Sequence, residues 1–420
     1  MASMSSTDIA ALELENVQEL IPELLKSETT LDSLIQDSGR AQRVGTIAYR
    51  IPLKFARPGD YKMGSLDGAA LPIGAGPKWD KGTLTPQVLM LPVGWTKLVE
   101  LVGVKADKVA VSNVVDETMA DAVEQLRNVR DVLLQTDGTG KIGIVSSIAS
   151  NVVTLQSGSA AGFGARLLFP GQTIGDWNGS TLRGTVGPID QVFNTLGGTQ
   201  SFHFTGSDPG FTNGDFIRVN GLTSGAPVAV NGIRAFINSS TSGSYLGITK
   251  STAPYVVSNA YDLGGGQITL PAARLLINQV QSRLGKKALK GQIWHTHPSQ
   301  VAAYEELGFE RQEIETDGTY KMMDLMFEDF RIAGYPIHSN NNADQTIWDF
   351  LQVKTFGKVM YGDGPFWYEA QGGKIYPIYD TSTGAPLTQF GATMIDASNY
   401  YCDNPLSNGS ITSARIPTGN

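Results

Sequence analysis

Between Asn113 and Gly140, apolar side chains recur every three or four residues, which is the spacing of one buried face on a long helix. The apolar positions are Val115, Met119, Ala122, Val123, Leu126, Val129 and Leu133. Asn113 can cap the N-terminus, acidic residues follow it, and the pattern ends at the sequence Asp-Gly-Thr-Gly. Roughly 24 residues at 1.5 Å per residue predict a rod of about 36 Å, long enough to brace a large subunit.

Two stretches before this helix, Thr46–Phe55 and Gln87–Leu101, alternate apolar and polar residues and are predicted to be strands. Between them, Arg57–Pro86 is rich in Gly and Pro and has little periodic apolar pattern. A loop of about 30 residues inside a compact domain usually has a function or a partner. The segment is therefore predicted to contact a partner, with a disordered surface loop as the alternative.

Residues 141–258 carry the strongest strand signal in the chain. Residues 142–157 are predicted to form a hairpin with Ser and Asn at its turn, and residues 214–237 repeat that arrangement. Asn213-Gly214 and Asn220-Gly221 stand at turn positions on either side of a short strand. The pattern predicts a β-rich barrel or sandwich with its core at about residues 145–235.

Residues 259–353 alternate helix and strand patterns, which predicts an α/β unit. The expected elements are the helix Pro271–Leu284, the strand Gly291–Thr296, the helix Ser299–Leu307 and strands around Pro336–Ile337 and Thr346–Phe350. Aromatic-rich strands are expected within residues 354–400. The polar tail of residues 401–420 is expected at the surface or in an interface.

The first 40 residues have a helical and acidic pattern. The apolar positions that share one face are Ile9, Leu12, Val17, Leu20, Leu24 and Leu25, and Pro22 would break or bend the helix. Two interpretations stay open, a helix that docks on the chain's own core and an arm that reaches a neighbouring subunit.

The long helix that ends in LLQTDGTG is followed downstream by three further stretches with a recognisable order. They are ITLPAARLLINQVQSRLG, KGQIWHTHPSQVAAYEELG and FRIAGYPIHSNNNADQTIWDFL. The chain resembles the major capsid proteins of tailed bacteriophages with the Hong Kong 97-like fold, over about residues 40–140 and 260–370. In that family a helix, a buried strand ending in a Pro-containing turn, a second helix and a G-x-P strand follow in the same order.

The resemblance implies an α+β fold with parts of known kind. They are an N-terminal arm (1–44), peripheral-domain strands with an extended E-loop (45–101, the loop at 57–86), a spine helix (102–140), an inserted β-rich domain (141–258), an axial α/β domain (259–353), a return to the peripheral domain (354–400) and a C-terminal tail (401–420). The E-loop would lie across an adjacent subunit through Tyr61, Lys62, Met63, Lys78, Trp79 and Lys81. Asp137, Gly138, Thr139 and Gly140 would form the structural turn, with both glycines at backbone angles that a Cβ would strain.

Composition limits the classes of function. The chain has 420 residues, 17% of them charged, 48 Gly and a formal net charge of −8. An acidic chain is a poor candidate for sequence-specific nucleic-acid binding, which depends on Lys and Arg. The single cysteine, Cys402, excludes an intrachain disulfide and suits a reducing cytoplasm. The sequence contains no run of 18 apolar residues, so it predicts no membrane span. Its N-terminus has no basic region followed by an apolar one, so it predicts no secretory signal.

Three patterns resemble chemical sites and are better explained otherwise. Gly138 to Gly143 satisfies G-x-G-x-x-G, but it closes a helix and opens strands, whereas a dinucleotide fingerprint follows a strand and opens a helix. His295 and His297 could share a metal, but no Cys or third His lies nearby in the sequence. The acidic cluster is typical of a solvated or subunit-facing surface, and it comprises Glu305, Glu306, Glu310, Glu313 and Glu315. We expect no catalytic, cofactor-binding or metal site.

The function implied by the resemblance is that of a major capsid protein. It would assemble into pentamers and hexamers around double-stranded DNA, without sequence-specific binding, in a virion built in the host bacterial cytoplasm. Portal, scaffolding, decoration and other capsid proteins are the expected partners, with no enzyme activity and no membrane. Alternatives are an encapsulin-type compartment, a β-rich carbohydrate-binding or adhesin protein that explains residues 141–258 alone, and a Rossmann-type enzyme.

Overall fold

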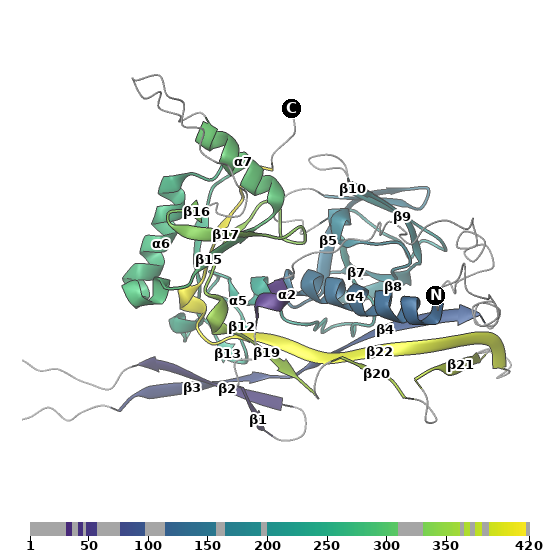
Figure 1. Cartoon of the computed structure of the whole chain (residues 1–420). Coiled ribbons are helices and arrows are strands. Elements are labelled where there is room, and N and C mark those ends of the chain that lie inside the picture. Colours follow the sequence, from purple (N-terminus) through teal and green to yellow (C-terminus); the bar gives the residue numbers. More distant parts are fainter. Residues whose placement is uncertain are drawn as a thin grey trace, which may run out of the picture.

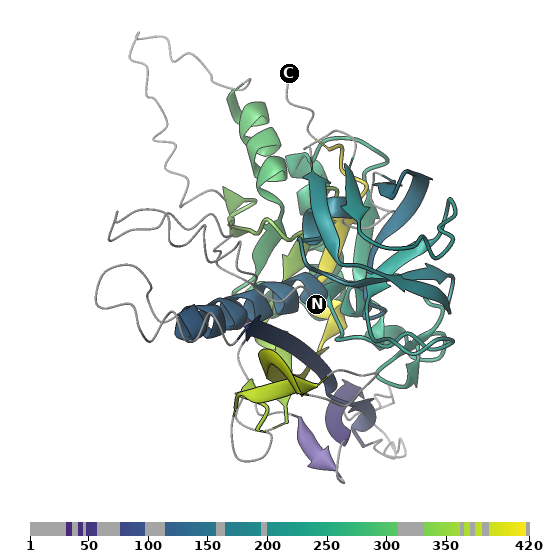
Figure 2. The same ribbon diagram turned by 90° about the vertical axis from the view of Figure 1, so that its right-hand side faces the viewer.

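The chain folds as a sheet-rich mixture of helices and strands. The computed structural model describes residues 31–35, 41–44, 48–56, 76–96, 114–156, 164–194, 200–309, 331–361, 365–369, 374–379 and 386–416. Figure 1 shows the long helix α4 running above the long strand β22, with the two ends of this pair carrying different units. Figure 2, a view turned by 90°, shows the same helix beside a separate group of strands.

The predicted long helix is confirmed as α4 (Val114–Leu134), and its expected cap Asn113 lies outside the described residues. Ala122, Leu126 and Leu133 are buried on the face predicted from the spacing. That face packs on β4 (Gln87–Thr96) and β22 (Pro386–Cys402). The apolar spacing therefore marks the contact between the helix and one sheet.

Strand β22 organises the five-stranded sheet beneath α4. It has 17 residues and pairs antiparallel with β4, from Gln87 opposite Ser398 to Thr96 opposite Gln389. The other strands that pair with it are β19 (Phe356–Met360), β20 (Phe366–Trp367) and β21 (Tyr376–Tyr379). The aromatic-rich strands expected in residues 354–400 are thus edge partners of one long strand.

A second sheet contains β1 (Gln42–Val44), β2 (Ala48–Ala56) and β3 (Lys78–Leu84) in that order. The predicted strand Thr46–Phe55 is confirmed as β2. The short helix α2 (Leu31–Leu34) precedes it, and Leu31 is buried against the central core. The predicted helical positions from Ile9 to Leu25 lie outside the described residues.

The segment with the strongest strand signal forms a seven-stranded sheet in the order β8-β7-β11-β5-β6-β10-β9. Its strands are β5 (Lys141–Ala149), β6 (Val152–Leu155), β7 (Ile174–Asn178), β8 (Thr181–Val186), β9 (Ile189–Asn194), β10 (Gln200–Phe204) and β11 (Phe216–Val219), with the 3-10 turn η2 (Gly164–Leu167). The predicted hairpin at 142–157 is confirmed, since Ser150 and Asn151 have φ of 49° and 61° at its turn. The sheet surrounds its own apolar core, which includes Ile142, Phe202 and Ile217.

The second hairpin predicted at 214–237 is wrong. Strand β11 pairs with β5 and β7, and the chain then enters the helical turn α5 (Ile233–Phe236). A Cβ at Gly232 would lie 2.2 Å from the Thr136 carbonyl oxygen, so this glycine lets the segment press against the end of α4. Close packing on the helix end replaces strand pairing, and Ile233 and Phe236 join the central core with Leu133.

The α/β unit forms a six-stranded sheet in the order β14-β23-β18-β15-β17-β16. Its elements are β14 (Asn259–Asp262), α6 (Leu270–Leu284), η4 (Lys286–Leu289), β15 (Ile293–Thr296), α7 (Pro298–Phe309), β16 (Arg331–Ile332), β17 (Tyr335–Ser339), β18 (Trp348–Leu351) and β23 (Gly409–Thr412). Both predicted helices and all the predicted strands are confirmed. Trp294, Trp348 and Phe350 form the centre of its core.

The prediction of a surface position for the polar tail is wrong. Strand β23 lies inside the six-stranded sheet, between β14 and β18, and Ile411 is buried. Polar groups of the tail are paired internally. The Asn408 side-chain nitrogen donates to the Thr355 hydroxyl at 3.1 Å, and the Asn408 side-chain oxygen accepts from the Gln352 backbone amide at 2.7 Å. Hydrogen bonding within the protein therefore replaces solvation of these residues.

Candidate intersubunit surface

The β2–β3 hairpin is held at its base by the chain's own core. Ile51, Leu53 and Leu84 are buried in it. The Thr83 amide donates to the Leu246 carbonyl at 2.9 Å, in the turn that joins the paired two-residue strands β12 (Ser244–Tyr245) and β13 (Ile248–Thr249). The base of the hairpin is therefore a fixed part of the subunit.

The opposite part of the hairpin exposes an aromatic side chain among cations. Trp79 is 59% exposed, and the Lys54 ammonium lies 5.3 Å from the centre of its ring. Lys78 and Lys81 are exposed as well, so these three predicted contact residues face solvent in the isolated chain. Tyr61, Lys62 and Met63 lie outside the described residues. A large exposed aromatic next to mobile charges is typical of an interaction surface.

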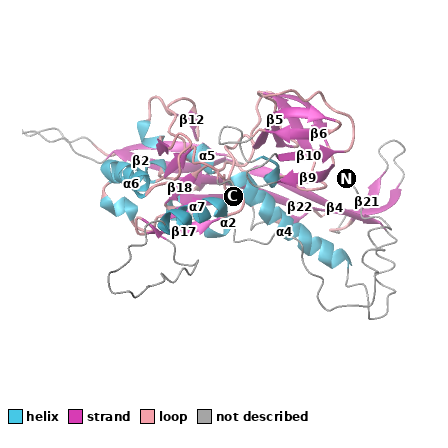
Figure 3. Cartoon of the chain, turned by 90° about the horizontal axis from the view of Figure 1, so that it is seen from above, coloured by secondary structure: helices cyan, strands magenta, loops and turns pink. Residues whose placement is uncertain are grey.

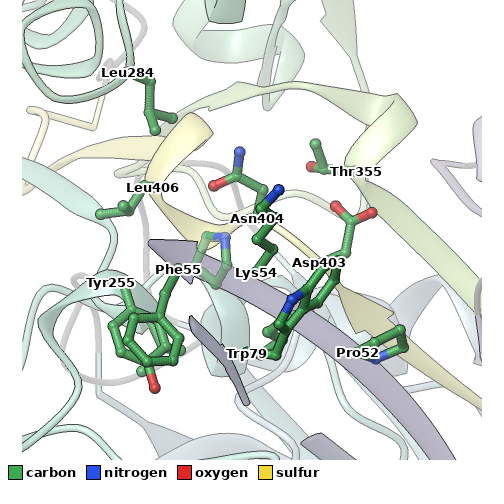
Figure 4. A pocket seen from close by; sticks show the side chains of 13 residues that line it. Pro52, Lys54, Phe55, Trp79, Tyr255, Leu284, Thr355, Asp403, Asn404 and Leu406 are labelled. Carbon is green, nitrogen blue, oxygen red and sulfur yellow. The ribbon is translucent and has the colours of Figure 1, made fainter. Parts of the chain in front are cut away.

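A groove runs beside the hairpin, between it and the 3-10 turns η3 (Pro254–Val256) and η6 (Pro405–Ser407). It has a volume of about 420 Å³, and its lining includes Trp79, Leu284 and Asp403 (Figure 4). Figure 4 also shows the rings of Phe55 and Tyr255 overlapping at its edge. Their centres are 4.4 Å apart with an angle of 7° between the planes, which is a stacked pair.

Tyr255 contacts both strands of the hairpin. Its hydroxyl donates to an Asp80 carboxylate oxygen at 2.7 Å. Burial and this carboxylate raise the pKa of Tyr255 to about 12, so the donor stays protonated at neutral pH. Stacking on Phe55 of β2 and hydrogen bonding to Asp80 of β3 tie both strands to η3.

The sheet under α4 has an outward apolar face that the sequence reasoning missed. On β4, Val88 is 57% exposed and Met90 is 61% exposed, while the face toward α4 carries the alternate residues. Phe366 of β20 is 48% exposed and stands opposite Ile395, which itself stands opposite Met90. The signal was present, because QVLMLPV is apolar at both alternating positions, as in strands covered on both faces. Figures 1 and 3 place β21, beside this face, and the β2–β3 hairpin at opposite ends of the molecule.

The Asp-Gly-Thr-Gly turn joins α4 to three other segments. Gly138 and Gly140 have φ of 84° and 68°, so the predicted backbone angles are confirmed. The Asp137 carboxylate accepts from the Thr139 amide at 2.9 Å. The carbonyls of Gly138 and Gly140 accept from the amides of Ala229 and Val219 at 2.8 and 3.1 Å. The turn is thus the point where the seven-stranded sheet leaves the helix and returns to it.

A buried ion cluster anchors the N-terminal segment beside α4. Arg130 lies 3.0 Å from Asp32 and 3.2 Å from Asp396, and the Lys358 ammonium lies 3.4 Å from Asp32. The Tyr400 hydroxyl donates to Asp32. Burial and the neighbouring Asp32 carboxylate raise the pKa of Tyr400 well above its usual value. Two cations balance two carboxylates, so the cluster can be buried without net charge.

One carboxyl in the seven-stranded sheet has no such compensation. Asp176 is fully buried on β7, and neither of its oxygens has a hydrogen-bond partner. Burial and the nearby Asp215 raise the pKa of Asp176 to about 7. This group therefore carries a proton under conditions in which an ordinary aspartate is ionised.

The residues that resembled a metal site are placed apart from one another. His295 Nδ1 lies 3.2 Å from His338 Nδ1, and its Nε2 lies 3.3 Å from the Gln135 amide oxygen. His297 contacts the Ser299 hydroxyl instead. Burial, first of all, lowers the pKa of His295 well below its usual value. Among the described residues, no group of three His, Cys, Asp or Glu side chains has the spacing to hold a metal ion.

The other two chemical patterns have structural explanations. The glycines from Gly138 to Gly143 close α4 and enter β5, so they open no helix N-terminus for a phosphate. Glu305 lies on α7, while Glu310, Glu313 and Glu315 lie outside the described residues. The helices of the described residues include none that is long and apolar enough to cross a membrane.

Comparison with known proteins identifies the fold. A chain of the cyanophage A-1(L) capsid asymmetric unit matches with a TM-score of 0.54 and 13% sequence identity, covering 98% of this chain and 98% of that chain. A chain of the capsid of an empty GTA particle has a TM-score of 0.47 and 10% identity over 99% of both chains. A chain of the holo-SrpI encapsulin complex from Synechococcus elongatus has a TM-score of 0.47 and 8% identity, covering 98% of this chain and 97% of that chain.

Only the first of these similarities is strong enough to support an argument, and at its level of identity it establishes the fold alone. No family model matches the chain. No curated protein matches it in sequence. The chain therefore has the fold of a phage capsid protein over nearly its whole length.

Proposed function

We propose that the chain is the major capsid protein of a tailed bacteriophage and has the Hong Kong 97-like arrangement. The observation that carries this proposal is the fold shared with the cyanophage capsid chain across 98% of both chains. The order of sequence motifs around the Asp-Gly-Thr-Gly turn and in the α/β unit points the same way. The protein would form a virion shell, assembled in the host bacterial cytoplasm.

The parts of the chain take capsid roles under this proposal. The β2–β3 hairpin is the E-loop, α4 is the spine helix of the peripheral domain, and the six-stranded sheet belongs to the axial domain. The inserted domain is the segment of residues 141–258 that contains the seven-stranded sheet. Residues 1–44, which include α2, are the N-terminal arm.

Assembly would join two different surfaces of neighbouring subunits. The hairpin that exposes Trp79 and the strand β21, which belongs to the same sheet as the exposed Val88 and Met90 of β4, lie at opposite ends of the subunit (Figures 1 and 3). Contacts between unlike surfaces generate closed rings, here hexamers and pentamers. Burial of exposed apolar area at about 25 cal/mol per Å² would supply the driving force.

The shell would enclose double-stranded DNA without reading its sequence. Portal, scaffolding, decoration and other capsid proteins are its proposed partners. Its proposed function needs no catalytic group, cofactor or metal, because it consists of repeated contacts between copies of the subunit.

Electron microscopy of the protein expressed alone tests the proposal, with capsomers or closed shells as the expected result. Trp79→Ala should lower the yield of assembled particles severalfold, because it removes the exposed anchor of the hairpin. Phe193→Ala is the matched control, because Phe193 is a 47% exposed aromatic on the seven-stranded sheet. Monomers under every condition would contradict the proposal. Particles that hold a protein cargo and no nucleic acid would replace it with an encapsulin-type compartment.

A further inference from the structure

A basic stretch interrupts this acidic chain. Residues 263–304 contain five cations and no Asp or Glu, in a chain whose formal net charge is −8. The cations are Arg274, Arg283, Lys286, Lys287 and Lys290. Such a local excess marks a surface for a negatively charged partner.

The structure exposes all five side chains on α6 and the turn after it. Helix α6 buries its other side, including Ala273, Leu276 and Val280, in the core of the α/β unit. The Gln352 side chain donates to the Lys290 carbonyl at 3.4 Å, which brings the turn η5 (Val353–Thr355) and its exposed Lys354 beside this group. We call the surface formed by Arg283, Lys286, Lys287, Lys290 and Lys354 the α6 basic face. Arg274 lies nine positions before Arg283, on the opposite side of the helix, and is not part of it.

The charges of this face are not used within the subunit. None of these five side chains lies within ion-pair distance of a carboxylate of the described residues. Arg283 donates to the Val257 carbonyl at 3.1 Å, which positions it without neutralising it. By contrast, the hairpin cations at the same end of the molecule are mixed with Asp80 and Trp79. Uncompensated cations held close together at the end of α6 and on the turns beside it repel one another, so a polyanion that binds them lowers that energy.

We infer that the α6 basic face binds the phosphate backbone of double-stranded DNA without reading its sequence. The inference rests on the proposed function, because a capsid interior presents a continuous polyanion with one charge per about 1.7 Å of helix axis. Arg283 and the three lysines fall within residues 283–290 and are all exposed, so the face can meet more than one phosphate at once. Lysines, which dominate it, act on phosphates as point charges and need no fixed orientation.

The test uses the unassembled subunit and a random-sequence DNA duplex, with binding measured between 50 and 200 mM salt. Each phosphate contact contributes about 0.9 to the slope of log affinity against log salt. The triple variant Lys286→Gln, Lys287→Gln and Lys290→Gln should therefore lower the slope by about 2.7, so that wild-type affinity falls about 40-fold more across this salt range. The matched control replaces Lys54, Lys78 and Lys81 of the hairpin by Gln, and its slope should stay at the wild-type value.

An unchanged slope in the triple variant, or an equal loss in the control, would overturn the inference. Binding of poly-glutamate that depends on the three lysines, with DNA binding unaffected, would assign the face to an acidic protein and overturn it as well. If shells form normally while the slope is unchanged, this inference fails and the proposed function stands. If the slope changes but no shell ever forms, the proposed function fails alone.

A second measurement avoids substitutions that could disturb folding. Lysine acetylation of wild-type particles, before and after DNA release, should modify Lys286, Lys287 and Lys290 severalfold faster in emptied particles. Equal rates at these three lysines in both states would contradict DNA contact at the α6 basic face.

Discussion

Replacement of Gly140 by Ala is the sharpest perturbation of the joint between α4 and the seven-stranded sheet. Gly140 has a φ of 68°, a conformation that costs a residue with a Cβ about 1–2 kcal/mol. An added Cβ would lie 2.8 Å from Val219 Cγ2, 3.0 Å from Leu222 Cδ1 and 3.2 Å from Ala229 Cβ. Overpacking of this kind adds about 1–3 kcal/mol, so the free energy of unfolding should fall by about 2–5 kcal/mol in total.

Gly171→Ala separates the two causes. Gly171 has a φ of 86°, and nothing lies within 4 Å of a Cβ added there. This control should lose only the backbone contribution of about 1–2 kcal/mol. Gly138→Ala should fall between the two, because its added Cβ would meet the Asn231 side-chain oxygen at 3.0 Å.

Urea denaturation of the unassembled subunit, followed by circular dichroism, measures the differences. Val in place of Ala at Gly138 or Gly140 should destabilise further, because a branched side chain enlarges the clash. If Gly140→Ala costs no more than Gly171→Ala, the close packing of the turn does not determine its stability and the reasoning is refuted.

Three further predictions concern buried charge and the β-rich segment. Arg130→Met leaves the buried Asp396 without its cation and leaves Asp32 with Lys358 alone, so it should cost about 3–5 kcal/mol in urea denaturation. Replacement of the exposed Arg127 by Met should stay within about 0.5 kcal/mol. Equal effects would contradict the cluster's role. The folded-state pKa of Asp176 is raised to about 7, so the free energy of unfolding should fall as pH rises from about 4 to 7. Asp176→Asn should therefore raise the melting temperature at pH 8 and leave it unchanged at pH 4. Equal shifts at both pH values would refute this. Excision of residues 141–219 with a short Gly/Ser linker should preserve capsomers in electron micrographs, because the two ends of this segment meet where the Gly140 carbonyl accepts from the Val219 amide at 3.1 Å. Excision of residues 145–235 should instead give insoluble protein, because it removes Val230 and Ile233 from the central core.

Local periodicity carried the predictions that the structure confirms. Helix α4 buries the face that its spacing marked, α6 and α7 form close to their predicted ranges, and the Ser150-Asn151 turn has the backbone angles that a tight hairpin needs. These signals lie within a few residues of one another, so the sequence alone contains them.

The contacts that the sequence did not predict are long-range or cooperative. Strand β23 enters a sheet beside β14, about 150 residues earlier in the chain, and its polar neighbours pair with groups that no local pattern identifies. In the candidate site, the exposure of Trp79 followed from its Gly- and Pro-rich context. The Tyr255–Asp80 hydrogen bond did not, because 175 positions separate its partners. The roles of Lys78, Trp79 and Lys81 at a subunit contact stay predictions.

Hydrogen exchange on unassembled and assembled protein tests the central claim, that the hairpin and the outward apolar face are covered by other copies of the chain. Backbone amides of Lys78–Lys81 at the exposed part of the hairpin, of β20 and of β21 should exchange quickly in the free subunit and markedly more slowly in shells. Amides near Leu126 and Leu133 of α4 should be protected in both states, because those side chains are buried within the subunit. Equal exchange rates at the hairpin and at both outer strands in the two states would contradict the account.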